Sequence, residues 1–477
     1  MIAFNHLFLD DDYPFLTPRE RETHTYVIGQ PGVGKSRAIE SWVMQDILKG
    51  NGVGVIDPHG DLYHNLTLRL VSRPEVWNRI VMIDPCNPKW VTPFNPLEAV
   101  PSLSSERLAL FLTDIIGKIW KMDLTSAPRM MWLLSNSFLA LTELKLTLLD
   151  LPRFLLDSDY RENLLPQISH TGAYSFFQNE YPKSQGAVLQ WASPVLNKIG
   201  SLIFDPDLSL MMVGKSKVSF RNIMDNRLIL LVNLPKGIVG DGASALLGAF
   251  IVAHIQKAAL ARADTNQRVP FYLYLDEFQN YTTDNIKDIL SEARKYCLSM
   301  TLANQYLNQL SPDIRSAILN TAGSIACFRV GSQDGISLAR EIFPSPDFLA
   351  TPMDRYKVRL PGFLSSMVFR NQADISGWDS QAQVLTRLPA REFWFRRRGL
   401  NDPVRYKTLD MSLPKKSPDT REQLEAMFDV SGRLYGRLKS DVRQDINQRY
   451  QPYPPSTRAS TGSQGSRIND NDSLWSV

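Results

Sequence analysis

A glycine-rich loop between a short apolar stretch and a helical pattern constrains this chain more than any other feature. Residues 29–36 read GQPGVGKS and match the whole pattern G-x-x-x-x-G-K-[ST]. The stretch TYVI before the loop is typical of a buried strand, and SRAIESWVMQDILKG after it has a helical apolar spacing that ends at Gly50. In such a loop, backbone N–H groups turn inward around phosphates, and the helix N-terminus adds a favourable dipole. The pattern therefore predicts a strand, a phosphate-binding loop and a helix.

The residues of this loop have expected parts in nucleotide binding. Lys35 would reach the terminal phosphates of ATP, and Ser36 would bind the Mg²⁺ that accompanies them. The alternative, a glycine-rich turn that arose by chance, is disfavoured by the flanking strand and helix patterns. The residues expected to contact the nucleotide are Gly29, Gln30, Pro31, Gly32, Val33, Gly34, Lys35, Ser36 and Arg37.

Two adjacent acids would supply the second part of a hydrolytic site. The stretch VPFYLYLDEFQN from Val269 predicts an apolar strand that ends at Asp276 and Glu277. Asp276 would complete the Mg²⁺ shell, and Glu277 would act as the general base for the attacking water. The alternative is a solvated strand end. Asp57 and His59 follow another predicted strand, where they either lie near the nucleotide or stabilise a turn of sequence DPHGD.

The separation of the two motifs in the sequence predicts an insertion. Lys35 and Asp276 are 241 positions apart, far more than the two or three strand–helix units of a compact nucleotide-binding core. Other strand-like runs are GVGVID, RIVMID, RLILLVNL, SMTLAN and SIACFRV, separated mostly by helical patterns, which predicts an α/β core with a mostly parallel central sheet. Between them, SSERLALFLTDIIGKIW and MMWLLSNSFLALTEL indicate helices. The expected inserted domain is therefore all-α.

The C-terminal part has a different character. The stretch REQLEAMFDVSGRLYGRLKSDVRQDINQRY could hold one or two charged helices, and a polar tail rich in Pro, Ser and Gly follows it. From Arg391 to the end, 16 Lys and Arg face 11 Asp and Glu, a net charge of +5. Residues 396–398, all arginine, would either touch nucleic acid or form a solvated basic surface.

The expected organisation is a lead segment at 1–22, a core at 23–95 and 226–412, an all-helical insertion at 96–225, a charged helical extension at 413–452 and a disordered tail at 453–477.

Composition excludes several classes of protein. Of the residues, 43% are hydrophobic and 21% are charged, which is globular usage rather than that of a fibrous or disordered chain. Cys86, Cys297 and Cys327 lie far apart in the sequence, so neither a disulfide framework nor a zinc cluster is supported. The sequence shows no signal peptide and no uninterrupted apolar run of about 18 residues. The longest apolar run, ASALLGAFIVAHI, predicts a buried helix.

An ordered set of stretches carries a resemblance to a known superfamily. These are IGQPGVGKS, GVGVIDPHGDL, FNPLEAV, LILLVNLPKGIVGDGASALLGAFI, YLYLDEFQNY, SEARKYCLSMTLANQYL and SIACFRVGSQDGISLA. The chain resembles the FtsK/HerA superfamily of ring-forming DNA motor ATPases, with a RecA-like P-loop core, and within it the TraG/TraD-like coupling proteins of conjugative type IV secretion. The insertion resembles the same branch through SAPRMMWLLSNSFLAL, TLLDLPRFLLDSDYRENLL and SPVLNKIGSLI. The resemblance covers about residues 25–410.

The resemblance implies further site residues and an assembly. It implies a hexameric ring that binds ATP and Mg²⁺ between neighbouring subunits, with DNA in or near the central channel. Gln305 matches the polar residue that senses the γ-phosphate. An arginine of a neighbouring subunit should complete the site at the transition state. Arg294, Arg315 and Arg329 are the candidates, and Arg329 could instead pair with Asp334.

The expected function is an ATP-driven motor that moves DNA in the conjugative transfer of a mobile element, with the helical insertion recognising DNA or the relaxosome. Coupling proteins of this type usually begin with transmembrane helices, whereas this sequence reaches its loop within 30 residues of Met1. We therefore expect a cytoplasmic ATPase without an anchor of its own, either recruited to the inner membrane by a partner protein or put to another use as a soluble motor. The expected partners are relaxase or relaxosome and secretion-channel proteins.

Two alternative functions stay open at this point. One is a HerA-like translocase that processes DNA ends with a nuclease partner. The other is a nucleotide-switched module that recruits a protein without moving DNA. The presence of both Lys35 and Glu277 argues against the second alternative, because a pure binding module has no need of a general base.

Overall fold

A nine-stranded sheet forms the centre of the computed structural model, which describes residues 17–99, 103–123, 125–281, 286–346, 348–349, 377–400, 402–414 and 417–449. The strand order is β10-β9-β8-β1-β7-β6-β2-β5-β3. Seven strands run parallel, and β9 and β10 add an antiparallel hairpin at one edge. The strands are β1 (Thr25–Ile28), β2 (Gly52–Asp57), β3 (Ile80–Ile83), β5 (Ile229–Asn233), β6 (Phe271–Leu275), β7 (Leu298–Asn304), β8 (Ser324–Cys327), β9 (Glu392–Arg396) and β10 (Val404–Lys407).

The parallel strands confirm the predicted α/β core. Each of the seven stretches predicted as a strand overlaps one of them. The reason is that a parallel sheet covered on both faces needs continuous apolar runs, and every residue of β1, β2, β3, β5 and β6 is buried. The β9–β10 hairpin was not predicted, because β9 alternates buried and half-buried residues and β10 is mostly exposed.

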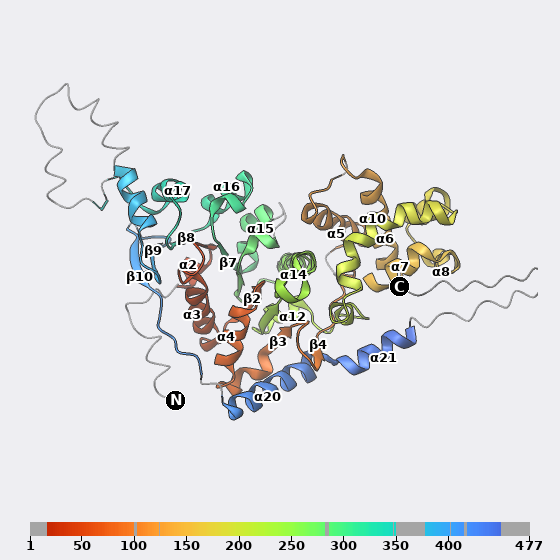
Figure 1. The fold of residues 1–477 in the computed structure, drawn as a ribbon, viewed down its shortest axis with the longest axis horizontal. Coiled ribbons are helices and arrows are strands. Elements are labelled where there is room, and N and C mark those ends of the chain that lie inside the picture. Colours follow the sequence, from red (N-terminus) through yellow and green to blue (C-terminus); the bar gives the residue numbers. More distant parts are fainter. Residues whose placement is uncertain are drawn as a thin grey trace, which may run out of the picture.

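Helices cover both faces of the sheet (Figure 1). On one face, α3 (Lys35–Leu48), α4 (Asp61–Leu70) and α20 (Pro418–Tyr435) share an apolar cluster with alternate strand residues such as Val27 and Val55. The intervening residues, such as Tyr26 and Ile56, belong to the cluster on the other face. The helices there are α14 (Asp241–Ala261), α15 (Ile286–Glu292), α16 (Pro312–Thr321) and α17 (Ser332–Ile342). Two short helices are α2 (Pro18–Arg21) and α13 (Lys236–Val239).

Helix α14 lies in the core of the protein. Among the described residues, one stretch, Asp241–Asp264, is long and apolar enough by itself to cross a membrane. Its apolar window has a mean hydropathy of 1.5, but 83% of that window is buried inside the fold. The stretch predicted as a buried helix is therefore one, and the helix is longer than the apolar run that indicated it.

Helices fill the chain between β4 (Trp90–Val91) and β5, where no described residue belongs to a strand. They extend the apolar cluster of the α14 face sideways, beyond the edge of the sheet at β3, as the right side of Figure 1 shows. Contacts of α14 with α5, α10 and α12 join this helical region to the core. The helices are α5 (Ser105–Ile119), α6 (Pro128–Glu143), α7 (Leu151–Leu156), α8 (Ser158–Leu164), α9 (Thr171–Ser175), α10 (Gln185–Ile203), α11 (Leu208–Met211) and α12 (Phe220–Asp225).

The C-terminal helices α20 and α21 (Lys439–Arg449) form a strap along the lower side of Figure 1. Helix α20 packs on the turn before β3 and on β3 itself, and the strand β11 (Arg437–Leu438) pairs with β4. At the start of α21, the buried Lys439 donates to the carbonyl of Pro85 at 2.8 Å and to Oδ1 of Asp207 at 2.7 Å. The strap therefore runs from the sheet core to the helical region. The predicted tail at 453–477 lies outside the described residues.

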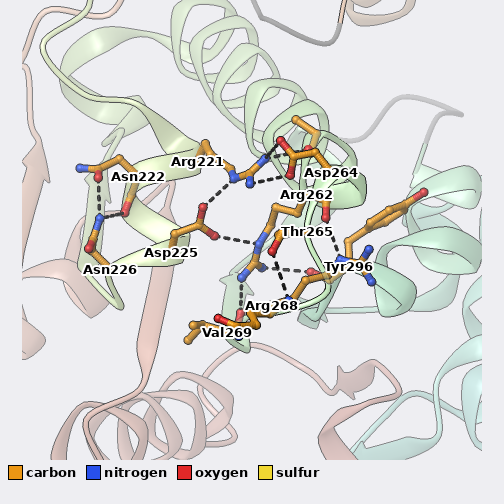
Figure 2. Close-up of polar contacts among 12 residues, drawn as sticks. Arg221, Asn222, Asp225, Asn226, Arg262, Asp264, Thr265, Arg268, Val269 and Tyr296 are labelled. Atoms are coloured by element: carbon orange, nitrogen blue, oxygen red, sulfur yellow. Dashed lines mark hydrogen bonds and ion pairs between the residues drawn. The ribbon is translucent and has the colours of Figure 1, made fainter.

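A buried arginine ties the end of α14 to its surroundings (Figure 2). Nε of Arg262 lies 3.0 Å from Oδ1 of Asp225, the last residue of α12. Its two Nη atoms donate to the carbonyls of Tyr296 and Val269, which lie before β7 and β6. Arg221 reaches the other carboxylate oxygen of Asp225 at 2.6 Å. The cluster therefore fixes the end of the helical region against the amino ends of two central strands.

Candidate nucleotide-binding site

The glycine-rich loop connects β1 to α3 at the carboxyl edge of the sheet. Gly32 and Gly34 have φ of 74° and 107°, in the left-handed region that glycine adopts without steric cost. Gly29 packs so closely on the residue after β8 that a Cβ on Gly29 would lie 2.5 Å from Cβ of Phe328. No side chain caps the start of α3 at Lys35. The N–H groups of its first turn are therefore available to bind an anion.

Lys35 is buried among carbonyl groups of its own loop. Its Nζ donates to the carbonyl oxygens of Gly29 at 2.6 Å and Gln30 at 3.1 Å. Burial lowers the pKa of Lys35, although the charges of Glu277 and Asp276 act in the opposite direction. An ammonium group that is removed from water gains from a nearby anion. Lys35 is thus ready to exchange loop carbonyls for a phosphate.

Asp276 follows β6 directly and faces the loop. Its Oδ2 accepts from the Ser36 hydroxyl at 3.4 Å, and its Oδ1 accepts from the backbone N–H of Glu277 at 3.1 Å. Burial, followed by the charges of Asp57 and Glu277, raises the pKa of Asp276 to about 7. A dication would stabilise the ionised carboxylate. A carboxylate and a hydroxyl next to a phosphate site are the oxygen donors that Mg²⁺ prefers, with phosphate oxygens and water completing its shell.

Among the described residues, no three His, Cys, Asp or Glu side chains form a cluster that could hold a metal by themselves.

Glu277 is held in a strained conformation with two amide partners. Its φ of 45° and ψ of 50° place a non-glycine residue in the left-handed region, which is costly and is common at functional sites. Oε1 accepts from Nε2 of Gln305 at 3.1 Å, and Oε2 accepts from Nε2 of Gln279 at 2.8 Å. Asn280 donates to the Glu277 carbonyl at 2.7 Å and is held in turn by Lys236 at 2.6 Å. The carboxylate therefore has a fixed direction.

Gln305 comes from the end of β7, as predicted, and lies beside Glu277. Its backbone N–H donates to Oε1 of Gln309 at 2.9 Å, and the N–H of Tyr306 donates to the same atom at 3.2 Å. The residues predicted from three separate stretches, Lys35, Glu277 and Gln305, thus meet at one edge of the sheet. Sequence reasoning missed Gln279 and Gln309, although Gln279 stands two residues after Glu277.

Asp57 stabilises a turn, which is one of the two roles predicted for it. Its carboxylate accepts from the backbone N–H groups of His59 at 2.8 Å and Tyr63 at 2.9 Å, at the start of α4. It also contributes to the raised pKa of Asp276. Asp57 therefore acts on the site through its charge.

The C-terminal hairpin contributes a second neighbour of the loop that sequence reasoning missed. Arg391, with φ of 72°, donates its backbone N–H to the carbonyl of Val33 at 2.7 Å. A Cβ on Gly34 would lie 3.2 Å from Cα of Arg391. The side chain of Arg37 donates to the carbonyl of Met411 at 3.1 Å, so it faces this segment. An antiparallel strand pair at 392–407 was the one signal that could have pointed to this contact.

The three candidate arginines have different environments. Arg329 lies against the glycine-rich loop of its own subunit, where its Nε is 3.3 Å from Oε1 of Gln30. Asp334, its predicted alternative partner, accepts instead from the backbone N–H of Leu307. Arg315 lies 3.4 Å from the hydroxyl of Ser337. The side chain of Arg294 is 49% exposed and lies 3.5 Å from Glu22.

The arginines at 396–398 are mostly engaged within the protein. Arg396 is half-buried and donates to the carbonyl of Glu341 at 2.7 Å. Arg397 lies 3.6 Å from Glu20, and Arg398 is exposed.

The fold and the arrangement of these residues define a class: a RecA-like P-loop fold with a mostly parallel central sheet. Solved structures of the conjugative coupling protein TrwB and of VirB4 share this fold. The plasmid coupling protein TrwB, in complex with a non-hydrolysable GTP analogue, aligns with a TM-score of 0.55 and 14% identity over 84% of this chain and 89% of that one. TrwB with ADP and Mg²⁺ aligns with a TM-score of 0.53 at the same identity and coverage.

VirB4 of Thermoanaerobacter pseudethanolicus aligns with a TM-score of 0.50 and 13% identity, over 81% of this chain and 89% of that one. At these identities the likeness is one of fold. No protein-family model matches the sequence, and no curated protein matches it.

Proposed function

We propose that this protein is a Mg²⁺-dependent ATPase that moves DNA, a coupling-type motor of conjugative or type IV secretion transfer. The observation that carries the proposal is the meeting of Lys35, Asp276, Glu277 and Gln305 at the carboxyl edge of the sheet. The fold shared with TrwB and VirB4 supports it, and TrwB has been solved with an ATP analogue and with ADP and Mg²⁺.

The chemistry follows from the positions of the side chains. Lys35 and the N–H groups at the start of α3 bind the phosphates. Ser36 and Asp276 would hold Mg²⁺, which would supply positive charge to the phosphate oxygens. Glu277 accepts the proton of the attacking water. Nε2 of Gln305 donates to the Glu277 carboxylate at 3.1 Å. In the proposed mechanism, Gln305 turns to the γ-phosphate when ATP binds. Loss of that phosphate returns Gln305 to Glu277, which reports hydrolysis to β7.

A ring of subunits would complete the site with an arginine from a neighbour. Such a residue needs an exposed side chain that its own subunit does not use at the nucleotide. Arg294 meets this condition best of the three candidates, because Arg329 contacts its own loop and the side chain of Arg315 is half-buried. We propose a homo-hexamer, as the family resemblance implies.

The helical region is the proposed surface for DNA and for relaxase or secretion-channel partners. It lies beside the nucleotide core and shares the apolar cluster of the α14 face. A movement of α14 or of the turn after β6 would therefore reach it directly.

The first test is the steady-state ATPase rate of the purified protein without DNA, with single-stranded DNA and with duplex DNA, while oligomeric mass is recorded in the same buffer. Stimulation by DNA in a ring-sized assembly is the expected result. An ATPase rate that is indifferent to DNA in a confirmed ring would contradict translocation and support the recruitment module. A nuclease that copurifies and cuts DNA ends only with ATP would support the HerA-like alternative.

The catalytic assignment predicts a separation of binding from turnover. Lys35→Ala should lose nucleotide binding or turnover, because the phosphates lose their buried cation. Glu277→Gln should still bind ATP, while turnover falls by about 100-fold or more, because the amide cannot accept the proton. A fluorescent ATP analogue measures binding and phosphate release measures turnover. Unchanged hydrolysis by Glu277→Gln would remove Glu277 from its proposed role.

A further inference from the structure

Two glutamines hold different oxygen atoms of the same carboxylate. Gln305 donates to Oε1 of Glu277 and Gln279 donates to Oε2, at 3.1 and 2.8 Å. Glu277 itself is buried. The amide nitrogen must be the atom that faces each carboxylate oxygen, since an amide oxygen there would be repelled. Both oxygen atoms of Glu277 are thus engaged in the structure.

The two contacts cannot have the same part in hydrolysis. Under the proposed function, Gln305 leaves Glu277 for the γ-phosphate, and this exposes Oε1. Gln279 follows Glu277 by two residues in the turn η6 (Phe278–Asn280) and moves with it. Its contact with Oε2 therefore persists when Gln305 departs. A general base needs one free oxygen in a fixed direction, and this arrangement leaves Oε1 as that atom.

The amide oxygen of Gln279 indicates that stability alone does not account for a glutamine at this position. Oε1 of Gln279 is buried without a hydrogen-bond partner. An unpaired buried polar atom is unfavourable, and such groups in folded proteins often mark functional positions. A methionine of similar length would avoid this cost at the same place. The contact with Glu277 is the interaction that a glutamine adds.

Gln279 also lies where the core meets the helical region. With Gln309, Lys118 and Lys121 it lines a pocket of about 400 Å³ between the end of α5 and the turns after β6 and β7. Gln309 holds the backbone of Gln305. The pocket thus joins the residues that orient Glu277 and Gln305 to the loop after α5.

We propose that Gln279 is a positioning residue for ATP hydrolysis, which holds Oε2 of Glu277 so that Oε1 faces the attacking water once Gln305 has turned to the γ-phosphate. This inference rests on the proposed ATPase function. It assigns the proton-accepting oxygen to Oε1 and predicts that Gln279 affects turnover much more than nucleotide binding.

The test compares Gln279→Met with wild type and with the matched control Gln423→Met, which changes an exposed glutamine of α20, outside the helical region. Steady-state turnover gives kcat and KM, and a fluorescent ATP analogue gives the nucleotide Kd. Gln279→Met should lower kcat at least tenfold while KM and Kd stay within threefold of wild type. Gln423→Met should match wild type in all three. Thermal unfolding checks the fold, and Gln279→Leu replaces Gln279→Met if that variant unfolds.

A double variant separates positioning from a general structural role. In single-turnover experiments with labelled ATP, Gln279→Met should cause no further loss in the Glu277→Gln background, because the residue acts through Glu277. A kcat within threefold of wild type, a loss explained by KM, or losses that multiply in the double variant would each overturn the inference. Wild-type turnover equal to that of Glu277→Gln would overturn the proposed function as well.

Discussion

At the scale of the residue, the site buries ionisable side chains whose pKa values differ from those they have in water. Asp276 is buried near two other carboxylates, Asp57 and Glu277, and its pKa rises to about 7 for this reason. Lys35 is buried nearby and its pKa falls. Both groups lose the solvation of their charged forms in the free protein. The Mg²⁺ and phosphate charges proposed for this place would relieve both costs at once.

This cost predicts that Asp276→Asn stabilises the free protein. Because the folded pKa lies above the ordinary value of 3.8, the folded state binds the extra proton between about pH 4 and 7, and ionisation at higher pH destabilises it. The variant should gain about 1 to 3 kcal/mol at pH 8 and less at pH 5. Urea unfolding at both pH values measures the difference. A gain that is equal at both pH values would show that ionisation of Asp276 is not its source.

At the scale of the element, helix α14 and the turn after β6 depend on a close approach. A Cβ on Gly248 would lie 2.2 Å from the ring of Tyr281, which is buried directly after η6. The helix can therefore pass over the turn that carries Glu277 only because residue 248 has no side chain.

Gly248→Ala should destabilise the protein by about 1 to 3 kcal/mol and lower ATP turnover, because Tyr281 and the adjoining turn must move. Gly242→Ala is the matched control in the same helix, where a Cβ meets nothing within 4 Å. It should leave turnover unchanged and stabilise by up to about 1 kcal/mol, since alanine favours helix. Thermal unfolding and phosphate release measure both. Equal behaviour of the two variants would contradict the steric argument.

The sequence predicts an element correctly when the contacts that define it join residues close together in the chain. The strand at 52–57 and the helix at 35–48 have bounds close to those predicted, because their apolar spacing is a local property. The loop and the Asp276–Glu277 pair are also local patterns. The contacts of Gln279 with Glu277 and of Arg391 with Val33 depend on backbone geometry or on residues far apart in the chain. No spacing rule reaches such contacts, so the sequence alone did not indicate them.

At the scale of the whole molecule, two buried histidines link stability to pH. His24 contacts the carbonyl of Leu290 and the N–H of Met300 between the first strand and its neighbours, and His254 in α14 contacts the carbonyl of Pro96. Burial lowers the pKa of each to about 4. The two residues lie in different parts of the core, so acid should loosen the fold as a whole.

The wild-type free energy of unfolding should fall as pH falls from 6.5 toward 4, where the unfolded chain binds protons that the folded protein does not. Each histidine contributes up to about 1.4 kcal/mol per pH unit in this range, and Asp276 opposes part of the sum. His254→Gln keeps a donor for Pro96 and should reduce the slope by that amount. Urea titrations from pH 7 to 4.5 measure it. An unchanged slope would exclude His254 as a source.

The C-terminal strap has a consequence for how the protein is made. Met427 of α20 belongs to the apolar cluster on the α3 face, and Val442 of α21 belongs to the cluster on the opposite face. Arg37 is translated early, but the carbonyl of Met411 that accepts its hydrogen bond lies 374 positions later in the sequence. A ribosome must therefore release almost the whole described chain before either face of the sheet can close. The nascent protein therefore spends most of the synthesis of these residues with its nucleotide loop incompletely supported, because the segment at Met411 is made late.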